Sequence, residues 1–133
     1  AASVRNRLRP MVSDGASYFG VLAHVAALAD GRDWVREAAD EIEGNKAFFA
    51  AQLAEHLPTL SYDPQPGTYL AWLDCTALGL DKPAAHFRTE GKVALNNGAD
   101  FGADYGQFVR MNLAASPEII TEAVDRMARS VGR

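Results

Sequence analysis

The pattern of apolar and polar positions predicts two helices in the first half of the chain. Residues 18–29 are apolar on nearly every side, and Gly31 stands where a helix would end. A helix apolar all round expects to be covered on several sides. A longer helix is expected from a cap at Asp33 to about Leu57, and Pro58 ends it. Its apolar stripe at helical spacing is Val35, Ala39, Ile42, Phe49, Leu53 and Leu57, interrupted by Asn45 and Lys46.

Lys46 has two interpretations, because it interrupts an apolar stripe. A buried lysine can act as a Schiff-base amine, since desolvation makes its nitrogen nucleophilic. We favour the other interpretation, in which its stem lies along the edge of the core and its ammonium reaches water.

The second half of the chain predicts a small sheet and two further helices. Strands are expected at 68–74, 92–95 and 107–114, where β-forming residues gather. One helix is expected to begin at a cap, Asp81, and to run to about Glu90. The last helix is expected to begin at Ser116 and Pro117 and to bury Ile120, Val124, Met127 and Val131. Because strands 92–95 and 107–114 are joined by a loop, they are natural antiparallel neighbours. The predicted fold class is α+β, an α/β two-layer sandwich in which helices cover one face of a mainly antiparallel sheet.

Strand 107–114 carries different chemistry on its two faces. Side chains alternate across a strand, so Val109, Met111 and Leu113 share an apolar face, while Phe108, Arg110 and Asn112 share the other. The guanidinium of Arg110 is well shaped for binding a carboxylate through two hydrogen bonds. The alternative is an ordinary surface arginine on a half-exposed strand.

Composition and net charge limit the kinds of function that the chain can have. The chain has 133 residues, 48% hydrophobic and 23% charged, which suits one domain with a real core. Its net charge of −4 gives no general attraction to nucleic acid or to an anionic membrane. No apolar run is long enough to span a bilayer, and the single cysteine, Cys75, fits a reducing cytosol, so we expect a cytoplasmic protein. Arg5, Arg7 and Arg9 could form a phosphate-binding patch, although a solvated segment is the more ordinary interpretation.

Several kinds of site are absent from the sequence. No Cys or His cluster has metal-ligand spacing, and His86 stands alone as an ordinary helix residue. No glycine-rich phosphate loop and no nucleophile elbow is present. The patterns alone therefore predict an α+β domain with one arginine suited to an anion.

Three strings and their order resemble a known family. They are Gly-Thr-Tyr-Leu-Ala-Trp-Leu-Asp at 67–74, Gly-Ala-Asp-Phe-Gly at 98–102 and Phe-Val-Arg-Met-Asn-Leu-Ala at 108–114, followed by a terminal helix that begins with proline. Together they resemble the C-terminal (small) domain of fold type I enzymes that depend on pyridoxal 5'-phosphate (PLP). Within these aminotransferases, the resemblance is greatest to the cystathionine β-lyase or C–S lyase (MalY/PatB-like) kind.

The resemblance implies a role for four residues. Arg110 would bind the α-carboxylate of an amino-acid substrate, with Asn112, Asn97 and Gly98 nearby. The run Leu-Asn-Asn-Gly at 95–98 stands where the family more often has a Ser-Pro-Gly-like stretch, which leaves the substrate preference open. The resemblance implies no catalytic, cofactor-binding or metal-binding residue in this chain.

The resemblance also implies a domain organisation. Residues 1–133 would form a single domain, with a helical linker and long interdomain helix at 1–57 and a sheet–helix substrate-carboxylate domain at 58–133. Since the sequence begins Ala-Ala-Ser and Lys46, Lys82 and Lys92 lack the family's Schiff-base context, we expect a fragment without the upstream PLP-binding large domain.

The expected activity follows from that organisation. The isolated chain would be catalytically inert and hold no PLP, while its parent would be a homodimer acting on amino acids. Both β-elimination and transamination remain open. The alternative is a free-standing α+β module without catalysis that binds carboxylates, or that binds a protein through its apolar first helix and basic N-terminus.

Overall fold

The computed structural model describes residues 17–132. The chain divides into two compact units, Ala1–Ala39 and Asp40–Arg133, and their boundary falls inside a long helix. The segment with Arg5, Arg7 and Arg9 lies outside the described residues. The predicted division at residues 57 and 58 stays a prediction.

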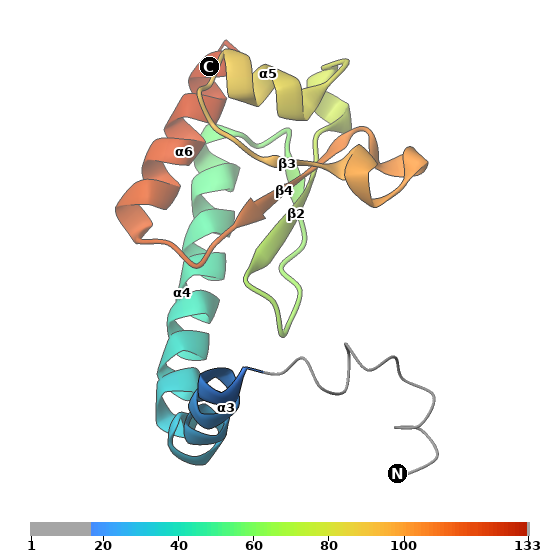
Figure 1. The fold of residues 1–133 in the computed structure, drawn as a ribbon. Coiled ribbons are helices and arrows are strands. Elements are labelled where there is room, and N and C mark those ends of the chain that lie inside the picture. The colour runs from blue at the N-terminus through green and yellow to red at the C-terminus, as the bar shows by residue number, and fades with distance from the viewer. Residues whose placement is uncertain (1–16, 133) are drawn as a thin grey trace. The chain divides into compact units, whose positions relative to one another are not determined.

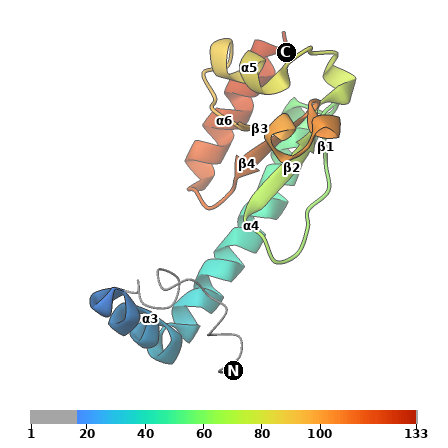
Figure 2. The same ribbon diagram turned by 45° about the vertical axis from the view of Figure 1, so that its right-hand side comes forward.

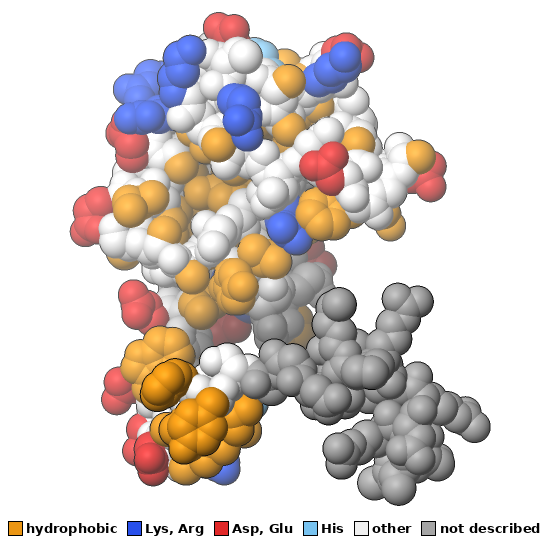
Figure 3. All heavy atoms as spheres, in the orientation of Figure 1, with side chains coloured by type: hydrophobic (Ala, Val, Ile, Leu, Met, Phe, Trp, Pro, Cys, Tyr) orange, Lys and Arg blue, Asp and Glu red, His pale blue; other side chains and the backbone are white. Residues whose placement is uncertain are grey.

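Helix α3 (Tyr18–Asp30) confirms the first predicted helix. The Ser17 hydroxyl oxygen caps it by accepting a hydrogen bond from the backbone N–H of Gly20 at 3.3 Å, and Gly31 follows its last residue. No residue of α3 is buried, so the expected cover is not provided within the described residues. Hydrophobic side chains gather over this helix in Figure 3, and its large exposed ones are Tyr18, Phe19, Val21, Leu22, Val25 and Leu28.

Helix α4 (Arg32–His56) begins one residue before Asp33. The expected cap at Asp33 is therefore wrong: the residue lies in the first turn, where its carboxylate pairs with Arg36 and suits the helix dipole. Burial begins only in the second half of the helix, at Asn45, Lys46, Phe49 and Leu53, while Val35 and Ala39 of the predicted stripe are exposed.

Within residues 17–132, four short strands form one antiparallel sheet in the order β1-β2-β4-β3. They are β1 (Ser61–Tyr62), β2 (Leu70–Asp74), β3 (Asn96–Asn97) and β4 (Phe108–Asn112). The two central strands confirm the predictions at 68–74 and 107–114. The pairing on the other side of β4 is antiparallel as expected, but the predicted strand at 92–95 is wrong, because the pairing occurs at 96–97.

The segment 92–95 is turned toward a helix rather than toward the sheet. Lys92 has a positive φ of 56°, and the backbone N–H of Val93 donates to the carbonyl of Phe87 at 2.9 Å. Since that N–H is already satisfied at the end of helix α5 (Pro83–Thr89), pairing with β4 begins only at Asn96. The expected cap at Asp81 is also wrong: the cap position is Lys82, and its side chain makes no capping hydrogen bond.

Helices cover one face of the sheet, as predicted for this α+β fold. Figures 1 and 2 both show α6 (Pro117–Ser130) and the second half of α4 beside β2 and β4. Ser116 and Pro117 start α6 as expected, although Val131 lies just past its end and is only half buried. The main core side chains from the sheet are Ala71, Leu73, Val109 and Met111, and those from the helices are Phe49, Leu53, Phe87, Ile120, Val124 and Met127.

Lys46 corrects another expectation. Its side chain is only 3% exposed, so the ammonium does not reach water. Its Nζ donates to the Glu43 carboxylate at 2.6 Å and to the backbone carbonyl of Gln65 at 2.8 Å. A buried charge needs such partners, and the Gln65 carbonyl is available only because the loop before β2 folds back against α4.

Asn45, the neighbour of Lys46, ties α4 to the end of β4. Its amide nitrogen donates to the backbone carbonyls of Leu113 and Ala115, each at 2.9 Å. Both amide hydrogens are therefore used, which satisfies a buried polar group.

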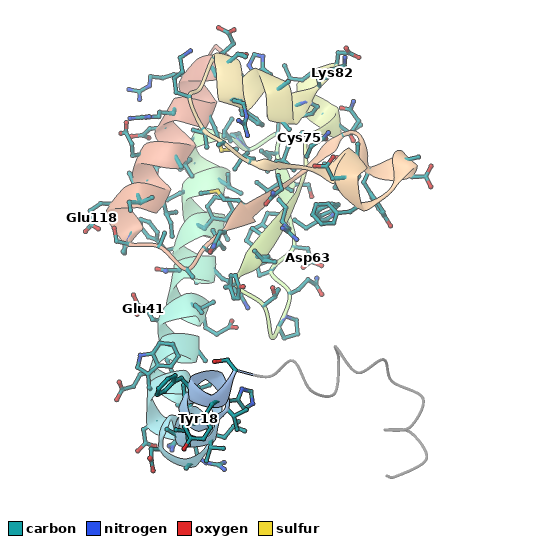
Figure 4. All side chains as sticks on the ribbon, in the orientation of Figure 1. Tyr18, Glu41, Asp63, Cys75, Lys82 and Glu118 are labelled. Carbon is teal, nitrogen blue, oxygen red and sulfur yellow. The ribbon has the colours of Figure 1, made fainter. Side chains whose placement is uncertain are left out.

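The buried thiol of Cys75, labelled in Figure 4, predicts a loss of stability in alkali. Burial raises the pKa of this thiol from its ordinary value of 9.0 to about 12, and the neighbouring Asp74 carboxylate adds to the rise. Between these two pKa values the folded state keeps a proton that the unfolded state has lost. The contribution of the protonated Cys75 thiol to the free energy of unfolding is therefore full below pH 9 and falls as pH rises toward 12.

Urea unfolding of the wild-type chain and of Cys75→Ala, from pH 8 to pH 11, measures this contribution. We expect the stability difference between the two proteins to shift against the wild type as pH rises, because all other titrations are common to both. A difference that stays constant across this range would contradict the prediction.

Candidate functional site

Arg110 lies in the centre of the sheet, on the face opposite the helices. It stands across from Trp72 of β2 on one side and from Asn96 of β3 on the other. The alternation predicted for this strand is present, since Val109 and Met111 are buried in the core while Arg110 is half buried on the other face. Two neighbouring strands thus set the position of the guanidinium.

The guanidinium of Arg110 has neutral neighbours. Its Nη2 donates to Oδ1 of Asn96 at 3.3 Å, and its Cζ lies 4.4 Å from the centre of the Phe101 ring. Its Nε is shielded from solvent and has no hydrogen-bond partner. No carboxylate within residues 17–132 forms an ion pair with it. The arginine therefore has a positive charge that no carboxylate within residues 17–132 neutralises. Its shielded Nε–H has no acceptor, which destabilises the folded state unless another group supplies one.

Several aromatic side chains pack together beside this arginine. Trp72 stacks on Phe108 with ring centres 5.6 Å apart and makes edge contacts with Phe101 and Tyr105 at the same separation. Phe101 and Tyr105 come from the short helical turns η2 (Gly98–Phe101) and η3 (Ala103–Tyr105) and stay 47% and 44% exposed. The face carrying Arg110 thus places a cation beside a partly exposed aromatic surface.

The other predicted polar site residues, Asn112 and Asn97, lie near Arg110, but their side-chain oxygens already accept hydrogen bonds. Asn112 lies on the same face of β4, but its Oδ1 accepts from the backbone N–H of Ala114 at 2.8 Å. Asn97 lies next to Asn96 on β3, and its Oδ1 caps η2 by accepting from the N–H of Ala99 at 3.3 Å. A substrate role for either residue stays a prediction.

Gly98 has a packing role in this segment. A Cβ at this position would lie 2.2 Å from the carbonyl oxygen of Tyr105 and 2.6 Å from that of Phe108. Because both obstacles are backbone atoms, a side chain at Gly98 would push η2 away from β4. The glycine thus holds the segment that carries Phe101 against the strand that carries Arg110.

Asn96 and Phe101 are the residues of this face that the sequence analysis missed as neighbours of Arg110. The strand expected at 92–95 ended just before Asn96, so no pairing with Arg110 was predicted. The sequence did contain a clue, because the polar residues Asn96 and Asn97 directly follow the predicted strand at 92–95. Extending that strand to residue 97 would have placed a polar side chain beside the strand that carries Arg110.

The described residues offer little to a metal ion or to the cofactor's attachment. No group of three or more His, Cys, Asp or Glu side chains in residues 17–132 could hold a metal. In the same range, no helix combines the length and the apolar character that crossing a membrane requires. Of the three lysines, Lys46 is engaged in the interior and Lys92 donates to the carbonyl of Thr89. Lys82 is exposed at the start of α5 (Figure 4).

Comparison with known proteins identifies the family. The model of the aminotransferase class I and II family matches residues 1–127. The chain belongs to this family. Within it, "Putative cystathionine beta-lyase" of Mycobacterium tuberculosis (strain CDC 1551 / Oshkosh) is 38% identical over 149 residues, which cover 98% of this chain and 37% of that protein. "Cystathionine beta-lyase" of Corynebacterium glutamicum is 35% identical over 122 residues, which cover 91% of this chain and 32% of that protein.

Solved structures agree with this membership of the aminotransferase class I and II family. A "putative plp-dependent beta-cystathionase" from Corynebacterium diphtheriae superposes with a TM-score of 0.91 at 34% identity, covering 99% of this chain and 35% of that one. A "PLP-bound putative aminotransferase" from Clostridium difficile 630 superposes with a TM-score of 0.83 at 31% identity, covering 87% of this chain and 30% of that one. The predicted resemblance to fold type I PLP enzymes of the cystathionine β-lyase kind is confirmed. The chain spans about a third of the length of these relatives.

Proposed function

We propose that this chain is the substrate-carboxylate domain of a PLP-dependent C–S lyase or aminotransferase, and that Arg110 binds the α-carboxylate of an amino acid. The observation that carries the proposal is the state of the Arg110 guanidinium. It is held by a neutral amide and an aromatic ring, with no carboxylate paired to it in the described residues. A substrate carboxylate would complete such a site through two charge-assisted hydrogen bonds.

The role of this chain is orientation rather than bond breaking. The three lysines described above do not fit the cofactor's attachment, so we place that attachment, and the acid–base groups, outside this chain. PLP supplies the electron withdrawal that reactions at the Cα atom of an amino acid require. Arg110 would hold the carboxylate so that Cα keeps one position and one orientation, which is how a binding residue raises a rate. The isolated chain would then be inert.

The relatives' names favour β-elimination as the reaction. Applied to L-cystathionine, it converts one substrate and one water into homocysteine, pyruvate and ammonia. Transamination would instead move the amino group to a keto acid and release no thiol. We also propose that the parent protein acts on an amino acid, forms a homodimer and lies in the cytoplasm.

An assay of the full-length protein with added PLP and L-cystathionine tests the proposal. We expect thiol and pyruvate to appear in equal amounts, and the 133-residue chain alone to produce neither. Amino-group transfer to a keto acid without thiol release would make the parent an aminotransferase. If the full-length protein turned over no amino acid while the isolated chain bound small carboxylates, the alternative of a binding module would replace the proposal.

A further inference from the structure

Asn96 is the only described residue that hydrogen bonds to the Arg110 guanidinium. The two residues are direct partners in the pairing of β3 with β4. Side chains at directly opposite positions of an antiparallel pair have Cβ atoms roughly 5 Å apart. The contact is therefore built into the backbone register, rather than being a chance meeting of two long surface side chains.

The neutrality of the Asn96 amide matters for what Arg110 can bind. A carboxylate at position 96 would form an ion pair and compensate the guanidinium charge. The amide oxygen instead fixes the direction of Nη2 and leaves the full positive charge available to a ligand. The Asn96 side chain thus orients the guanidinium of Arg110 without neutralising its charge.

Phe101 provides a second restraint from the same segment. Its ring covers one face of the guanidinium at 4.4 Å, and the ring is itself held edge-on against Trp72 at 5.6 Å. Phe101 thus closes that face to a ligand and leaves the N–H edges of the guanidinium, through which a planar carboxylate binds. Gly98, between the two restraints, keeps the segment close to β4.

We propose that Asn96 is a positioning residue for Arg110, and that its uncharged amide makes the site select anionic, carboxylate-bearing ligands. Phe101 assists by limiting the guanidinium to one plane. This inference rests on the proposed function, because it assumes that Arg110 meets the substrate. It adds a residue on β3, whose effect on substrate binding is exerted entirely through the arginine.

Three substitutions at Asn96 distinguish its effect on the orientation of Arg110 from its effect on the charge. Asn96→Ala removes the acceptor, so we expect the KM of the full-length enzyme for its amino-acid substrate to rise about tenfold, with a smaller change in kcat. Asn96→Asp keeps an acceptor but compensates the charge, so we expect KM to rise about 100-fold. Asn96→Gln keeps a neutral amide and should restore part of the affinity lost in Asn96→Ala.

Side-chain NMR of the 133-residue chain provides a readout that does not depend on catalysis. The heteronuclear NOE of the Arg110 Nε–H group reports whether the guanidinium is ordered. We expect this NOE to fall in Asn96→Ala and to stay at the wild-type level in Asn96→Asp, so that order and affinity change separately. Gln107→Ala, near the start of β4, serves as the control and should change neither KM nor the NOE.

The outcomes distinguish this inference from the proposed function. If Arg110→Ala raises KM while Asn96→Ala leaves both KM and the NOE unchanged, only the positioning role is overturned. If Asn96→Asp binds substrate as tightly as the wild type, the charge argument is overturned. If Arg110→Ala itself leaves KM unchanged, the proposed function fails, and the inference fails with it. Unfolding midpoints within the error of the wild type would show that the exposed Asn96 variants are folded.

Discussion

Arg110→Ala is expected to raise the KM of the full-length enzyme for its amino-acid substrate by roughly 10²- to 10³-fold. Removing one partner of a hydrogen-bonded charge pair typically costs about 2–5 kcal/mol, and about 1.4 kcal/mol corresponds to a tenfold change. The value of kcat should fall as well, because a substrate held only by its other groups reaches the reactive orientation less often. Steady-state kinetics with a single amino-acid substrate measures both parameters.

Two further variants show whether the geometry of the guanidinium matters. Arg110→Lys keeps the charge but loses the planar fork, so its KM should lie between those of the wild type and of Arg110→Ala. Arg88→Ala removes an exposed arginine on α5 that forms no ion pair in residues 17–132, and should leave KM unchanged. A KM near the wild-type value in Arg110→Ala would rule out the carboxylate role.

Phe49→Ala is expected to destabilise the fold by about 3–5 kcal/mol, since a cavity replaces a large buried side chain. Phe49 is fully buried on α4 and makes an edge contact with Tyr62 of β1, with ring centres 5.2 Å apart. The substitution removes the ring that joins the long helix to the edge of the sheet. A typical domain has only about 5–15 kcal/mol of stability, so this loss would be a large part of the total. Chemical denaturation, followed by circular dichroism, gives the change in the free energy of unfolding.

Two exposed positions provide the matched comparison for Phe49. Phe19→Ala removes the same side chain from a site that is 78% exposed, and Ile119→Ala removes a 62% exposed side chain from α6. Each should change the free energy of unfolding by less than about 0.5 kcal/mol. A similar loss in all three variants would mean that burial of Phe49 does not contribute as the structure indicates.

Local periodicity was enough to predict the two sides of the central strands. In β4, the period of two placed Val109 and Met111 in the core and Arg110 on the other face before any partner strand was known. The same holds for the start of α6, because Ser116 and Pro117 act within one turn of the helix. These features depend on neighbours in the sequence, and the sequence contains those neighbours.

Features that depend on contacts between distant segments could not be predicted in the same way. Lys46 was expected to reach water, yet its ammonium is buried because a backbone carbonyl 19 residues later becomes its acceptor. The segment 92–95 was expected to pair with β4, yet the N–H of Val93 is used by α5. In both cases a hydrogen bond formed only in the folded chain decided the outcome.

The sequence by itself determined the family, the order of the main elements and the choice of Arg110 as the candidate carboxylate ligand. Motifs and alternation carry that information, since both are properties of consecutive residues. Only the tertiary structure decided what surrounds the arginine. Asn96 lies 14 residues before it and faces it through the antiparallel register, and the ring of Phe101 covers it through a turn packed at Gly98. The suitability of an arginine at position 110 for a carboxylate could be predicted from local chemistry. The orientation of its guanidinium, and the lack of a paired carboxylate in residues 17–132, depend on strands and turns that meet only when the chain folds.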